Sequence, residues 1–278
     1  MDINILLKAK AYDLGQPYFP GMPHFPSHPP FLYGLTKKHG EILYGGGATS
    51  AADAIALGTH VGTHIDALSH FACDGVCYGG RAVDHTHEHG MSKLGIDTVA
   101  PILRRGVLLD IARLEGVDVL PEDFTVTPEH LSRASHVQIN AGDIVLLRTG
   151  WARFFSDPKR YINNTVVPGA GIEAAKWLSS RNIFAAGSDT VAFERTPSPD
   201  MSVHTHLLVQ SGIHIIEVLN LEELARDKIY EFAFVAAPMN IRGATGAPVR
   251  PLAFPISSGL ASVARVSDTR IESQTDER

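Results

Sequence analysis

The segment from residue 60 to residue 71, HVGTHIDALSHF, places three histidines and one aspartate in a short span. Imidazole and carboxylate groups bind zinc, manganese and related divalent ions, and histidine also serves as an acid or base near neutral pH. A functional metal centre is therefore the first hypothesis. The alternative is structural: the same side chains would only form hydrogen bonds within a strand and a turn.

Backbone geometry limits how this segment can fold around an ion. In a straight strand, which rises about 3.3 Å per residue, His60 and His64 would lie roughly 13 Å apart, too far to share one ion. A helix would bring them together, but residues 61–63 are Val, Gly and Thr, which are poor helix formers. We therefore predict a bend at Gly62, where the missing side chain permits unusual dihedral angles. Such a bend would bring His60 back toward His64 and Asp66.

The same segment resembles a family signature, His-x-Gly-Thr-His-x-Asp-x-Pro-x-His. It is typical of the metal-dependent cyclase-type hydrolases, which include bacterial kynurenine formamidase and isatin hydrolase. Leu68 stands where the signature has proline, and this is the one departure. The resemblance covers roughly residues 10–260. It implies a single α/β domain of the swivelling β/β/α type, with a mixed β-sheet or barrel-like core flanked by helices.

The resemblance also assigns roles within the segment. It implies that His60, His64 and Asp66 hold a first divalent ion, which would be zinc or manganese. It implies that His70 is a catalytic residue rather than a ligand, relaying protons between the attacking water and the leaving group. Asp66 could bridge to a second ion, so the expected cofactor is one or two ions.

Two more candidate ligands lie downstream. Residues 201–210 are predicted to form a helix, and residues 212–217 a buried strand that ends in Glu217. A glutamate closing an apolar run is unfavourable unless it is paired or bound to a metal. The resemblance implies that a histidine of this helix and this glutamate bind metal; by register we assign His204, with His206 as the alternative. The structural alternative is a salt-bridged Glu217 and a surface His204.

A proline-rich segment spans residues 17–30. Its fixed backbone angles exclude a helix and favour an extended, semi-rigid loop. It could be a linker or surface arm, but its aromatic side chains favour a wall over an active site or across a subunit interface. By resemblance, we expect Phe25 in this segment to contact substrate, and Phe71 to do so from the end of the metal-binding segment.

The remaining chain alternates predicted strands and helices, which indicates an α/β fold. Apolar runs predict buried strands at 106–112, 142–150, 182–187 and 230–237, and helices are predicted from Thr127 and over 171–180. We expect one domain over residues 1–266, followed by a polar, flexible tail over residues 267–278.

Composition narrows the class of protein and its partners. The chain has 278 residues, a net charge of −6 and no basic run, which argues against nucleic-acid binding. No apolar run is long enough to span a membrane, and the first residues do not read as a secretion signal. We therefore expect a cytoplasmic protein with a small-molecule substrate. The resemblance adds a homo-oligomer, either a dimer or a tetramer.

The sequence thus predicts a metal-dependent hydrolase that cleaves an amide, lactam or ester bond of a small, aromatic substrate. A lactone hydrolase of the same family and a non-catalytic metal-binding domain are the alternatives. A cupin-type dioxygenase also uses histidines and a glutamate, but the predicted helices at 127–135, 171–180 and 201–210 argue against an all-β cupin. The chain has no Gly-x-Ser-x-Gly elbow for a nucleophilic serine.

Overall fold

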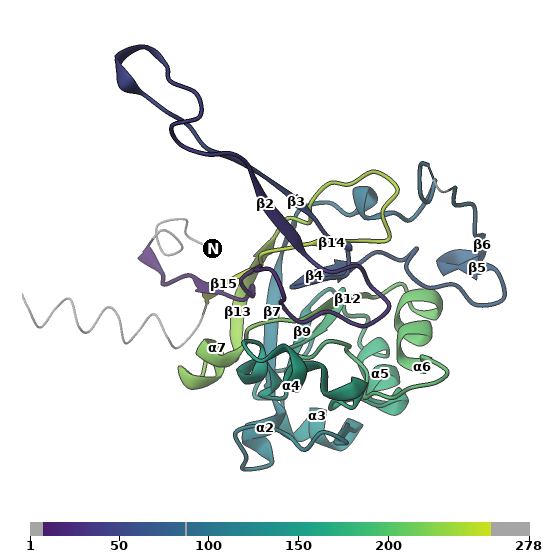
Figure 1. Ribbon diagram of the computed structural model, residues 1–278. Coiled ribbons are helices and arrows are strands. Elements are labelled where there is room, and N and C mark those ends of the chain that lie inside the picture. The colour runs from purple at the N-terminus through teal and green to yellow at the C-terminus, as the bar shows by residue number, and fades with distance from the viewer. Residues whose placement is uncertain (1–7, 87, 257–278) are drawn as a thin grey trace, which may run out of the picture.

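The computed structural model describes residues 8–86 and 88–256 (Figure 1). The predicted tail at 267–278 and the last residues of the expected domain, 257–266, lie outside the described residues.

A curled, mixed sheet forms the centre of the described chain, with nine strands in the order β1-β15-β13-β7-β9-β11-β12-β4-β14. The four strands in the middle are parallel to one another, and the strands on either side pair antiparallel. The parallel strands are β7 (Ile102–Asp110), β9 (Ile144–Arg148), β11 (Ala185–Ser188) and β12 (His214–Glu217). The flanking strands are β1 (Tyr12–Asp13), β15 (Leu252–Pro255), β13 (Glu231–Ala236), β4 (His64–Asp66) and β14 (Gly246–Pro248). The predicted α/β fold with a mixed, barrel-like sheet is confirmed.

The apolar runs of the sequence form the buried strands, although some boundaries differ. All five residues of β9 are buried, as expected for a parallel strand covered on both faces. The strand predicted over 106–112 instead begins at Ile102 and ends at Asp110. Its predicted end was wrong because the Asp110 side chain accepts a hydrogen bond from the Arg113 backbone N–H and starts helix α2 (Ile111–Leu114).

Most of the helices pack on one face of the sheet (Figure 1), whereas α7 (Glu222–Arg226) contributes Leu224 and Ala225 to the core on the opposite face. Helix α3 (Pro128–Ala134) begins as predicted, with Thr127 as the N-cap and proline in the first turn. Helix α5 (Ile172–Ser179) also lies where it was expected. The segment predicted as one helix over 201–210 is helical but changes type. It begins as α6 (Ser202–His204) and continues as a π-helix over Thr205–Gln210.

The two faces of the sheet carry separate cores. The core beneath the helices contains Ile215 of β12, whereas the core on the opposite face contains Ile216 of the same strand. Because side chains alternate along a strand, Glu217 points to the helix-covered face and His214 points to the opposite face. The two polar residues at the ends of β12 therefore lie on opposite faces of the sheet.

The other elements are short. They are the hairpin β2 (Leu32–Lys37) and β3 (Ala52–Ala56), the pair β5 (Val76–Cys77) and β6 (Arg81–Ala82), the pair β8 (Thr125–Val126) and β10 (Gly169–Ala170), and helices α4 (Pro158–Ile162) and α7 (Glu222–Arg226). No helix in the described part of the chain is both long and apolar enough to cross a membrane.

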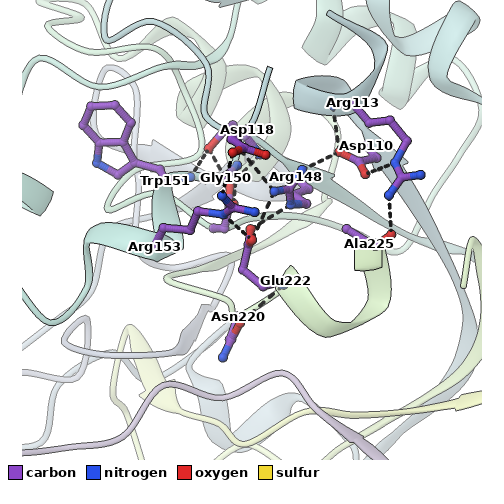
Figure 2. Close-up of polar contacts among 12 residues, drawn as sticks. Asp110, Arg113, Asp118, Arg148, Gly150, Trp151, Arg153, Asn220, Glu222 and Ala225 are labelled. Atoms are coloured by element: carbon purple, nitrogen blue, oxygen red, sulfur yellow. Dashed lines mark hydrogen bonds and ion pairs between the residues drawn. The ribbon is translucent and has the colours of Figure 1, made fainter. Parts of the chain in front are cut away.

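A buried ion network ties the ends of β7 and β9 to α7 (Figure 2). The Arg148 guanidinium, 5% exposed, lies 2.8 Å from an oxygen of Asp110 and 2.7 Å from one of Glu222. Glu222 also accepts a hydrogen bond from Arg153. These groups compensate one another's charge, so the network links α7 to the ends of β7 and β9 with its buried charges paired.

The proline-rich segment packs against its own domain. Met22 is 2% exposed and Phe31 is 7% exposed, and both belong to a third small core with Trp151. The hairpin β2–β3 follows this segment and projects from the body of the molecule (Figure 1).

Candidate metal centre

The predicted bend at Gly62 brings the histidines of the motif together. Gly62 has a φ of 68°, a conformation that favours glycine, and an added Cβ would lie 2.4 Å from the Tyr18 ring. The Tyr18 hydroxyl donates hydrogen bonds to the carbonyl oxygens of Val61 and Thr63, at 2.9 and 3.0 Å. Tyr18 therefore holds the bend from the proline-rich segment, a role that the sequence did not reveal.

Strand pairing places the downstream ligand candidates beside the motif. In the register of β4 and β12, Glu217 pairs with His64, so a residue far away in sequence lies next to the motif. Helix α6 contributes His204, which is 3% exposed. The alternative candidate, His206, lies away from this group, because its ring nitrogens contact Ser179 and Gln210.

Four of these side chains form a compact group of ligand atoms. His64 Nε2 lies 3.5 Å from Asp66 Oδ1 and 3.4 Å from Glu217 Oε2. His204 Nε2 lies 3.2 Å from Glu217 Oε1 and 4.0 Å from Asp66 Oδ2. Around a tetrahedral ion with bonds of about 2.1 Å, neighbouring ligand atoms lie about 3.4 Å apart. Most of these spacings are close to that value, so the four side chains fit one or two ions bound among them.

Electrostatics also favour a cation at this position. Asp66 is fully buried, and its Oδ2 atom has no hydrogen-bond partner among the described residues. Burial alone would raise the pKa of the Glu217 carboxyl, but contacts with His204 and His64 outweigh burial and lower it to about 2. The neighbouring histidines also outweigh burial at Asp66 and lower the pKa of its carboxyl group. Both carboxylates are thus anionic at neutral pH, and buried charges of this kind are usually paired or bound to a metal. The residues fit a divalent ion.

His60 and His70 form the side of the group nearest the proline-rich segment. His60 Nδ1 lies 2.7 Å from Asp66 Oδ1, and its Nε2 lies 2.9 Å from the Thr245 hydroxyl. The His70 ring stacks on the His60 ring with a centroid distance of 3.8 Å. Nitrogens of both histidines lie within 4.8 Å of an Asp66 oxygen, so geometry alone allows either ring to reach an ion.

His70 differs from the other histidines in its protonation. Burial lowers the pKa of His70 to about 3. The ring is therefore neutral at physiological pH. By contrast, burial disfavours the charged form of His204, but Glu194 and Glu217 outweigh this effect and raise its pKa to about 10. A bound cation would replace the His204 proton, since a metal-ligating imidazole is neutral.

Aromatic rings surround the group. The Phe71 ring lies 5.0 Å from both the His70 ring and the His204 ring. The Phe25 ring contacts His28, with a distance of 6.2 Å between the ring centroids. His28 in turn stacks on His60 with a centroid distance of 5.3 Å, a position that the sequence did not suggest.

The sequence analysis also missed Glu194, which orients His204. This side chain is 1% exposed, and its Oε2 lies 2.5 Å from His204 Nδ1 and accepts a hydrogen bond from the His204 backbone N–H. A carboxylate behind a ligating histidine fixes the ring orientation and raises its basicity. The only signal was an acidic residue between apolar and proline-containing stretches.

We expect Glu194→Gln to weaken metal binding without removing a ligand. Loss of such an outer partner typically costs 10- to 100-fold in metal affinity. The measurement is a metal titration of the chelator-treated variant by isothermal calorimetry. Glu173→Gln, which removes an exposed carboxylate paired with Lys176, is the control and should bind metal normally. Normal affinity in Glu194→Gln would show that Glu194 does not orient a ligand.

A family model described as a putative cyclase matches residues 12–195, which is more than half of the chain. The chain belongs to the cyclase family. The family predicted from the motif at residues 60–70 is thereby confirmed.

Characterised relatives of this cyclase-family chain are hydrolases. Isatin hydrolase of Roseibium aggregatum is 27% identical over 210 residues, covering 72% of this chain and 73% of the relative. Kynurenine formamidase of Bacillus cytotoxicus is 26% identical over 205 residues, covering 73% of this chain and 79% of the relative. Among solved structures, a novel cyclase matches with a TM-score of 0.82 at 29% identity, covering 91% of this chain and 89% of the other.

Proposed function

We propose that this protein is a metal-dependent hydrolase that cleaves an amide, lactam or ester bond of a small, aromatic substrate. The observation that supports this most strongly is the buried group of Asp66, Glu217, His64 and His204, with ligand spacing and one unpartnered carboxylate oxygen. We propose zinc or manganese as the ion, because imidazole and carboxylate ligands suit both.

Each residue has a role in this proposal. His60, His64 and Asp66 would hold one ion, and Asp66, His204 and Glu217 a second. A bound divalent ion would supply Lewis acidity, which polarises a carbonyl group and lowers the pKa of bound water to about 7. His70, which is neutral and lies beside Asp66, would accept the proton from the attacking water and deliver it to the leaving nitrogen or oxygen.

The aromatic surroundings support the substrate class. Phe71 lies against two of the histidines, and the His28 ring stacks over a third, so a planar substrate would meet ring faces next to the reacting carbonyl. The relatives named isatin hydrolase and kynurenine formamidase support cleavage of a C–N bond. A lactone would satisfy the same geometry and is the alternative substrate.

The test is a hydrolysis screen with the purified, metal-loaded protein. N-formylkynurenine, isatin and an aromatic lactone are offered separately, and release of the carboxylic acid is followed. We expect turnover of at least one compound, lost in the presence of a chelator. A protein that carries stoichiometric metal but hydrolyses none of a wide panel of amides, lactams and esters would instead be a metal-binding domain.

We further propose that the protein self-associates through the hairpin β2–β3. Every residue of the hairpin is exposed or half-buried, including Tyr33 and Leu35, which lie on one strand at 49% and 50% exposure. A two-stranded hairpin alone is at best marginally stable in water. A second copy that packs its own hairpin reciprocally, across a twofold axis, would cover both hairpins at once.

Replacing Leu35 by lysine should therefore lower the mass in solution. Light scattering after gel filtration should show a dimer or tetramer for the wild type and a smaller species for Leu35→Lys. Leu103→Lys is the control, because Leu103 is 66% exposed but lies on β7, outside the hairpin. A monomeric wild-type protein would contradict the proposal.

A further inference from the structure

A cavity of about 240 Å³ lies beside the first residues of β7 and β12, apart from the metal group. Its apolar wall includes Leu68, Leu94, Ile102 and Phe184. An apolar cavity of about 150 Å³ is large enough for a benzene ring. The volume here therefore fits one substituted ring.

The cavity and the metal group use opposite faces of the same strand. His214 lines the cavity, whereas Glu217, three residues later on β12, belongs to the metal group. Side-chain alternation directs these two residues to opposite faces of the sheet. A ligand in the cavity would thus contact no proposed metal ligand, although it would touch Leu68, which lies midway between Asp66 and His70 in sequence.

His214 supplies a hydrogen-bonding group inside the cavity. Its side chain is 8% exposed, and its Nδ1 lies 2.8 Å from the Asp66 backbone carbonyl oxygen. Since a carbonyl oxygen only accepts, Nδ1 carries the proton, and Nε2 of the neutral ring is an acceptor. No residue in the described ranges, 8–86 and 88–256, forms a hydrogen bond with this Nε2.

Arg104 supplies a positive charge at the same cavity. Its guanidinium lies over the Phe184 ring, 4.0 Å from the ring centroid, and donates one long hydrogen bond of 3.3 Å to the Gly142 carbonyl oxygen. It forms no ion pair with any carboxylate in the part of the chain that the structure describes. Several of its N–H donors therefore remain available, in the planar arrangement that matches a carboxylate.

We propose that this cavity is a second binding site, for a small aromatic carboxylic acid that carries a hydrogen-bond donor on its ring. The carboxylate would accept hydrogen bonds from Arg104, and the ring would lie between Phe184 and the leucine side chains. The ring hydroxyl or N–H would donate to Nε2 of His214. The proposal is independent of the hydrolytic activity, because no proposed metal ligand takes part.

The experiment measures binding of 4-hydroxybenzoate to the metal-depleted full-length protein by calorimetry and by ligand-observed NMR. Metal depletion matters because a carboxylate could otherwise bind the ion. We expect saturable binding in the wild type and at least tenfold weaker binding in Arg104→Gln. Benzoate, which lacks the hydroxyl donor, and the methyl ester of 4-hydroxybenzoate, which lacks the charge, should each bind more weakly than the acid.

The matched control is Arg181→Gln. Arg181 also lies over an aromatic ring, Trp177, at 3.3 Å, but it is not part of the cavity. It should bind 4-hydroxybenzoate like the wild type. Equal affinities in the two arginine variants would overturn the proposal, as would the absence of wild-type binding at millimolar concentration. A third contrary result is binding that requires metal and is unaffected by Arg104→Gln, which would place the acid at the metal group.

Discussion

Asp66→Asn should lose both hydrolysis and bound metal. Asparagine keeps the size of the side chain but removes its charge. Asp66 belongs to both groups of residues whose ligand atoms lie within 4.8 Å of one another, which are His60, Asp66 and His70, and His64, Asp66 and Glu217. Mutation of a residue that only hydrogen-bonds to a metal ligand already costs up to about 100-fold in metal affinity or activity. Loss of Asp66 as a ligand should therefore cost more than that factor. Metal content is measured by elemental analysis and turnover on whichever substrate the wild type accepts.

Asp143→Asn provides the matched control for this variant. Asp143 is also buried, at 4% exposure, but it pairs with Arg105 and belongs to neither ligand group. It should retain metal and turnover even if its thermal stability falls. If Asp66→Asn kept wild-type metal content, Asp66 would not be a ligand, and the proposed centre would be wrong.

His70→Ala should separate catalysis from metal binding. General acid–base catalysis contributes typically 10²- to 10⁴-fold, so turnover should fall within about that range while metal content stays unchanged. A His70 nitrogen lies within 4.8 Å of ligand atoms of Asp66 and His60, so geometry alone would allow His70 to bind an ion. Measuring metal content together with turnover distinguishes a ligand from a proton relay. Stopped-assay turnover and elemental analysis are measured on the same preparation.

His206→Ala is the control for the histidine change, since His206 contacts Ser179 and Gln210 outside the site. It should behave like the wild type. Loss of metal together with activity in His70→Ala would make His70 a ligand. Full activity in His70→Ala would show that His70 is not the proton relay.

The candidate residues whose proximity could be predicted from the sequence lie close together along the chain. His60, His64 and Asp66 are related by short spacings, and one glycine with a positive φ is enough to gather them. Strands such as β9 were predictable because burial on both faces requires an unbroken apolar run. Glu217 was predictable as an unfavourable charge at the end of such a run.

Other contacts depend on how the loops pack, which the motif spacing does not encode. Glu194 meets His204 across the ten residues that separate them, and Tyr18 meets the bend at Gly62 only after the proline-rich segment has packed. The contact of Phe25 with His28, whose ring stacks on His60, likewise follows from the packing of this segment. Element ends were missed where a local cap, such as Asp110, outweighed an apolar pattern.

The most direct test of the central claim is turnover as a function of bound metal. Protein stripped with a chelator is dialysed, and zinc or manganese is returned in fractions of one equivalent while hydrolysis is measured. The proposed centre predicts no turnover without metal and a rise that saturates after one or two equivalents. Full turnover in the stripped protein, with elemental analysis showing no metal, would contradict it.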